Sequence, residues 1–125
     1  MDRKFILMAF GYGILGLVLG MYMAGAKDHG QRVTHAHIML AGFVVSFVYG
    51  LCHKLWLNNT TSGLAVAQFY VHHAGAIVLF AGLFLLYGNF VSEAAVDAIL
   101  GIASFTVFAG LVLMSVLFFR SARSA

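Results

Sequence analysis

The sequence predicts an all-α membrane protein, a bundle of four transmembrane helices. Of its 125 residues, 62% are hydrophobic and only 9% are charged, whereas a soluble domain carries about 25% charged residues. Crossing a bilayer takes about 20 apolar residues in a helix. Four stretches are long enough to do so: residues 5–26, 34–57, 63–88 and 95–119. A chain of this length is expected to form one domain over residues 1–125.

Short polar links at residues 27–33, 58–62 and 89–94 join these stretches, so neighbouring helices are expected to run antiparallel. The basic residues predict their orientation, because cytoplasmic loops carry an excess of lysine and arginine. With the N-terminus inside, the outer side holds only Lys27 and Arg32. The inner side then holds Arg3, Lys4, Lys54, Arg120 and Arg123. We therefore expect an integral protein of the bacterial inner membrane with both termini in the cytoplasm.

Most other kinds of chemistry have no motif in this chain. The chain has no Walker motif, no GxGxxG after a predicted strand and no zinc-binding HExxH, and its four acidic residues all lie at segment ends. Cys52 is the only cysteine, so no intramolecular disulfide can form. The basic residues sit at helix ends as topology signals, which gives no reason to expect nucleic acid as a partner.

Six histidines are the unusual feature of so apolar a chain. An imidazole inside a bilayer is costly unless it is paired. His35 and His37 stand at the start of the second stretch and point about 200° apart on a helix. Two imidazoles at one depth on opposite faces favour metal ligation over packing. Because thiols and carboxylates are scarce, haem iron or copper suits this chain better than calcium or magnesium.

The remaining histidines leave alternatives open. His72 and His73 lie midway along the third stretch, where hydrogen bonding, a proton relay or metal ligation would each explain them. His53, near the inner end of the second stretch, suits either a hydrogen bond between helices or an interfacial position. His29 is expected to be solvated in a loop.

Small residues let helices approach closely in lipid. Gly16 and Gly20 form a GxxxG pattern in the first stretch, and Gly75 and Gly82 are seven residues apart in the third. We expect these glycines to serve tight packing within the bundle.

Residues 34–43, THAHIMLAGF, resemble the tenth helix of the catalytic subunit of haem–copper oxidases, a family that includes nitric oxide reductases and C-family cytochrome oxidases. Residues 69–79, FYVHHAGAIVL, are similar to the eleventh helix of that subunit. The resemblance is convincing over residues 34–79. The whole chain looks like one four-helix third of that twelve-helix subunit.

The resemblance implies a haem protein. In the family, the first histidine of the H-x-H holds the high-spin haem and the second holds the low-spin haem, so His35 and His37 are the expected axial ligands here. His72 and His73 are the second choice. Haem b is expected rather than haem c, because covalent attachment needs a CxxCH motif. The family's copper site needs histidines from helices that this chain lacks, so copper and a complete oxygen- or nitric oxide-reducing centre are not expected.

The resemblance also implies a homotrimer. His35 and His37 face opposite ways, so they cannot ligate one iron within a single subunit, and a neighbouring copy would supply the second ligand. In the family, twelve helices form three pseudo-equivalent groups of four. Three copies of this chain would rebuild that ring, with a haem at each interface.

Three functions remain open from the sequence. The first is a haem b protein that transfers electrons, to or from a redox partner that the sequence does not name, or senses a diatomic gas. The second is a cofactor-free accessory or assembly protein whose histidines bond between helices. The third is a transition-metal carrier that uses His35, His37, His72 and His73.

Overall fold

The computed structural model describes residues 1–124, and in these residues it contains helices and loops but no strands. Its elements are α1 (Asp2–Ala26), α2 (Arg32–His37), η1 (Ile38–Val44), α3 (Val45–Leu55), α4 (Gly63–Tyr87) and α5 (Glu93–Ser124). Because α2, η1 and α3 follow one another without a break, they form one helical rod. The resulting four rods are each long and apolar enough to cross a membrane, so the predicted all-α membrane fold is confirmed.

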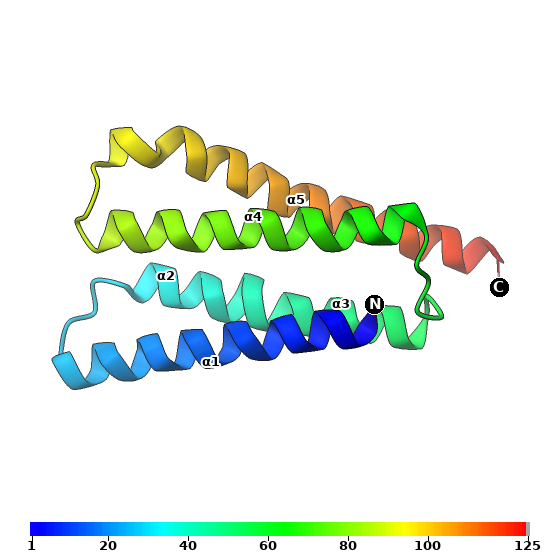
Figure 1. Ribbon diagram of the computed structural model, residues 1–125, viewed down its shortest axis with the longest axis horizontal. Helices are drawn as coiled ribbons and strands as arrows, with labels where there is room; N and C mark the ends of the chain where they lie inside the picture. Colours follow the sequence, from blue (N-terminus) through cyan, green and yellow to red (C-terminus); the bar gives the residue numbers. More distant parts are fainter. Residues whose placement is uncertain (125) are drawn as a thin grey trace.

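The four rods are arranged as two antiparallel hairpins that lie side by side (Figure 1). The first hairpin pairs α1 with the rod of α2, η1 and α3, and the second pairs α4 with α5. Both termini lie at one end, together with the loop of residues 56–62. We call this the terminal end. The opposite, distal end carries the loops of residues 27–31 and 88–92.

The helices begin and end close to the predicted positions for local reasons. Lys27 adopts a left-handed conformation with φ of 52° and closes α1, as residues after a helix commonly do. The Ser62 hydroxyl accepts the Ala65 N–H at 3.3 Å and so caps the start of α4. The largest departure is α5, which extends beyond the predicted residue 119 to Ser124.

The middle of the second rod is a π-helix, η1, in which each N–H bonds to a carbonyl five residues earlier. Gly42 lies in this segment against α1 and α4. A Cβ added to Gly42 would stand 2.8 Å from Tyr12 Cγ and 3.0 Å from Phe80 Cε2. Only glycine therefore permits this close meeting of three helices. The sequence analysis did not foresee the π-helix, and such segments are frequent at functional sites.

Glycines bring α4 and α5 together, as the sequence analysis expected for Gly75 and Gly82. A Cβ on Gly75 would stand 2.9 Å from both the Thr106 Cβ and the Val107 backbone nitrogen. A Cβ on Gly82 would stand 2.7 Å from Leu100 Cδ2. The second hairpin therefore depends on the absence of side chains at these positions.

Substitution of Gly75 tests this packing. We expect Gly75→Ala to destabilise the protein by about 1–3 kcal/mol, because overpacking of a tight contact typically costs that much. The matched control is Gly101→Ala on α5, where an added Cβ meets nothing within 4 Å. Thermal unfolding in detergent, followed by circular dichroism, measures both. Equal melting temperatures for the two variants would contradict the packing argument.

Candidate functional site

His35 lies half-buried on α2 and faces α1. Its Nδ1 is 2.7 Å from the carbonyl oxygen of Gly16. A carbonyl only accepts, so Nδ1 carries the proton and Nε2 is left as a free acceptor. A Cβ on Gly20 would stand 2.9 Å from His35 Cε1. In the described chain, the GxxxG of α1 therefore makes room for an imidazole as well as for close packing.

His37 is exposed on the surface of the single chain. Its Nδ1 is 2.8 Å from the carbonyl oxygen of Val33, one turn earlier in the same rod. The proton is again on Nδ1 and Nε2 is free. His35 and His37 thus face different directions, as expected, and in the neutral imidazole each keeps Nε2 as its free acceptor.

His72 and His73 are buried in α4 and bond to two different helices. His72 Nε2 lies 3.0 Å from the Ser46 hydroxyl of α3, and His73 Nδ1 lies 3.0 Å from the Tyr12 hydroxyl of α1. Ser46 follows His37 by nine residues, or about 13 Å along a helix at 1.5 Å per residue. The structure therefore brings His72 and His73 together with Ser46 and Tyr12, and not with the H-x-H.

His53 is fully buried near the terminal end, two residues before α3 ends at Leu55. Its ring stacks on Phe5, with ring centroids 5.3 Å apart and planes 20° apart. Gln68 lies beside the ring, but the geometry falls short of a hydrogen bond, and neither ring nitrogen has a partner. His29 is exposed in the loop of residues 27–31, as expected.

These buried side chains form a polar cluster in the half of the bundle nearer the terminal end. Its members are Tyr12, Ser46, His53, Gln68, His72 and His73. Within it, five side-chain atoms have no protein partner: both ring nitrogens of His53, Gln68 Oε1, His72 Nδ1 and His73 Nε2. Buried polar atoms are normally bonded, and internal water is their usual partner where protein groups are absent.

Among residues 1–124, no group of three or more histidine, cysteine, aspartate or glutamate side chains is placed to hold a metal ion. His35, His37, His72 and His73 therefore do not form a joint site within one chain. The transition-metal carrier considered from the sequence would need these four histidines at one site, and the described residues of a single chain do not place them together.

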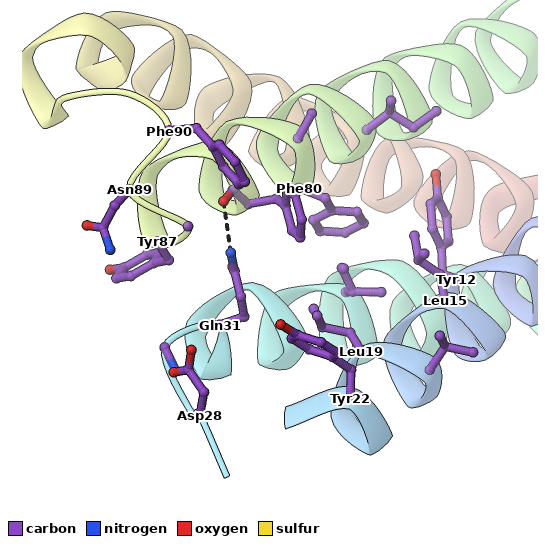
Figure 2. Close-up of a pocket in the computed structure, with 17 residues that line it drawn as sticks. Tyr12, Leu15, Leu19, Tyr22, Asp28, Gln31, Phe80, Tyr87, Asn89 and Phe90 are labelled. Carbon is purple, nitrogen blue, oxygen red and sulfur yellow. Dashed lines mark hydrogen bonds between the residues drawn. The ribbon is translucent and has the colours of Figure 1, made fainter. Parts of the chain in front are cut away.

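A cavity of about 870 Å³ opens between α1 and α4 towards the distal end (Figure 2). No histidine lines it. Gln31 shapes its wall by donating from Nε2 to the Phe84 carbonyl oxygen at 2.9 Å, while Thr34 Oγ1 donates to Gln31 Oε1 at 2.6 Å. The sequence analysis did not predict this cavity, which we call the distal pocket.

The sequence analysis also missed Tyr12, Ser46 and Gln68. Each is a polar residue inside an apolar stretch, which is the same signal that drew attention to the histidines. That signal could have marked them as candidates. It could not have said which histidine each would contact, because the contacts join separate helices.

No family model, curated protein or solved structure matches this chain. Its function is therefore argued from the geometry of its own residues.

The bond between Tyr12 and His73 can be tested by removing one hydroxyl. We expect Tyr12→Phe to destabilise the protein by about 0.6–1.7 kcal/mol, the range measured for hydrogen bonds between membrane helices. Tyr22→Phe is the control, because Tyr22 lies on the same helix and is 63% exposed. Chemical denaturation in mixed micelles compares the two. If both variants lose the same stability, the buried bond does not stabilise the bundle.

Proposed function

We propose that this chain is a haem b-binding membrane protein whose axial ligands are His35 and His37, each through Nε2. One observation supports this most strongly. Both imidazoles have Nδ1 bonded to a backbone carbonyl oxygen, which in the neutral imidazole leaves Nε2 as the free acceptor. Metal-ligating histidines almost always donate their other ring N–H to such an acceptor, which fixes tautomer and orientation. The resemblance of residues 34–43 to the H-x-H helix of the haem–copper oxidases supports the same proposal.

The surroundings of His37 suit a bound group from outside the chain. His37 is exposed in a rod that is apolar enough to cross a membrane. Its Nδ1 bonds to the Val33 carbonyl oxygen, and a second ring nitrogen without a partner is costly in such a segment. A haem at this position would cover the His37 imidazole, and its iron would take Nε2 as a ligand. Lys27 and Arg32, near the distal end, would supply positive charge for the haem carboxylates. When bound, the haem would supply one-electron redox chemistry or a site for a diatomic gas.

A homotrimer is part of this proposal. Because His35 faces α1 and His37 faces outwards, one chain cannot place both on one iron. His37 of one subunit would meet His35 or His37 of the next across a haem. The three groups of four helices in the resembled family favour three copies over two. We place both termini in the cytoplasm of a bacterial inner membrane, because that orientation puts five of the seven basic residues inside.

A second candidate is a cofactor-free accessory protein whose histidines hold helices together. The bonds from His72 to Ser46 and from His73 to Tyr12 favour it, since both connect separate helices. The bond from His35 to Gly16 also fits. His37 distinguishes the candidates, because it bonds only within its own helix and contributes nothing to interhelical packing through that bond.

The absorption spectrum separates these functions. We expect the purified protein to show a Soret band and sharp reduced bands of haem b, and acid–acetone to extract the pigment, because no cysteine pair can attach it. A colourless protein, after expression with ample haem supply and after haem addition, would favour the accessory function. Pigment that stays on the polypeptide would contradict haem b.

Variants test the ligands. His37→Ala is expected to lose most of the haem, and His35→Ala to lose haem or convert it to the high-spin form, because each removes an axial nitrogen. Gly20→Ala should weaken haem binding by displacing His35, since the added Cβ would stand 2.9 Å from its ring. Gly25→Ala is the control, with nothing within 4 Å. Unchanged spectra in both histidine variants would refute the ligand set.

The mass of the detergent-solubilised protein tests the trimer. Native mass spectrometry or light scattering corrected for bound detergent should give three chains, with up to three haems. The His37→Ala protein should dissociate more readily, because its interface would lack a ligand. A dimer, or a stable haem-loaded monomer, would overturn the interface arrangement even if His35 and His37 proved to be ligands.

A further inference from the structure

We propose that the distal pocket binds an uncharged ring lipid of the quinol type, meaning a flat ring that bears hydroxyl groups and carries a long apolar tail. The cavity of about 870 Å³ lies within the range of about 300–1,000 Å³ found for small-molecule sites. Helices α1 and α4 form its two long walls (Figure 2). This inference goes beyond the haem proposal and does not depend on it.

The lining of the pocket changes from polar at the distal end to apolar towards the middle of the bundle. Near the distal end its lining includes the polar side chains of Asp28 and Asn89 and the phenols of Tyr22 and Tyr87 (Figure 2). Towards the middle of the bundle the lining is apolar, with Leu15, Ile38, Ile77 and Phe80. A ligand that matches both parts has a polar head at the distal end and an apolar tail that runs along the helices.

The charge of the lining disfavours anionic heads. Among residues 1–124, Asp28 is the only charged residue that lines the pocket, and no lysine, arginine or histidine does so. A phosphate head or a haem carboxylate would lie near the Asp28 carboxylate with no cation in the lining to offset the repulsion between like charges. An uncharged head therefore suits this lining better than an anionic one. The distal pocket is also a poor site for haem, which agrees with the separate position proposed for the H-x-H.

The polar head must donate hydrogen bonds. Asp28 Oδ1 accepts the Gly30 N–H at 3.0 Å, which orients the carboxylate at the pocket mouth. An ionised carboxylate can only accept, so its remaining capacity suits a hydroxyl hydrogen of the ligand. Asn89 can donate or accept beside it. Gln31 does not compete for the head, because both ends of its amide are already bonded.

Aromatic side chains surround this polar end. Phe84 and Phe90 stack with ring centroids 6.0 Å apart and planes 23° apart, and Tyr22 and Tyr87 line the same end. Aromatic faces favour offset stacking with a flat ring over contact with a branched aliphatic head. A ring with hydroxyl groups can stack on the aromatic side chains and also donate a hydrogen bond to Asp28. A diacylglycerol can donate the hydrogen bond but cannot stack.

Binding of tritiated decylbenzoquinol tests the proposal. The full-length protein, purified in detergent with any group it retains, would be immobilised for a scintillation proximity assay with ascorbate to keep the probe reduced. We expect saturable binding that unlabelled decylbenzoquinol displaces, while dioleoylglycerol and dioleoylphosphatidylglycerol do not. Displacement by either of these lipids at the same concentration would assign the pocket to membrane lipid. Non-saturable binding, no greater than to protein-free micelles, would overturn the proposal.

Two alanines on α4 give a matched pair of variants. Ala81 lines the pocket, and Ala74, seven residues earlier, is exposed but does not line it. Ala81→Phe should narrow the cavity and weaken binding at least about tenfold, while Ala74→Phe should change it less than about twofold. Binding that survives unchanged in Ala81→Phe would place the probe elsewhere.

Asp28→Asn tests the head group without altering the volume of the pocket. We expect it to weaken quinol binding about fivefold, because a charged acceptor is replaced by a neutral one. It also keeps the test valid if Ala81→Phe fails to fold. Equal binding to Asp28→Asn and to the unchanged protein would refute the role of the carboxylate. Since neither His35 nor His37 lines the pocket, failure here would leave the haem proposal standing.

Discussion

A polar side chain in an apolar helix has to find its partner inside the protein, and this constraint organises the bundle. Four of the six histidines lie half-buried or buried between helices, at positions 35, 53, 72 and 73. Three of these four bond to another helix through Gly16, Ser46 or Tyr12. Each bond fixes how two helices lie relative to each other, because an unpaired imidazole in hydrocarbon would be costly.

Two histidines depart from this constraint in opposite ways. His53 is fully buried, and neither of its nitrogens has a partner, although Phe5 covers one face of its ring. His37 is exposed, and it bonds only to the carbonyl of Val33 in its own helix. Through that bond His37 connects no two helices. This is why we propose a ligand or a second copy of the chain as its partner.

Glycines decide where the helices can approach. Gly20 makes room for the His35 ring, Gly42 lets η1 approach Tyr12 and Phe80, and Gly75 lets α4 contact the backbone of α5. Where α1 and α4 diverge towards the distal end, side chains leave a cavity instead of closing the gap. The bundle is thus tightly packed around its buried histidines and open at the distal pocket, which no histidine among residues 1–124 lines.

The four spans could be predicted from the sequence because length and apolarity are local properties of each segment. The sequence also determined that His35 and His37 diverge, since two positions on a helix differ by about 200°. Only the tertiary structure decided that His35 meets Gly16 while His37 stays exposed, that His72 and His73 bond to Ser46 and Tyr12, and that His53 is buried. The π-helix at residues 38–44 and the distal pocket also came only from the structure. These features depend on the rotation and depth of one helix against another, which the packing of side chains from separate segments sets and which no single segment encodes.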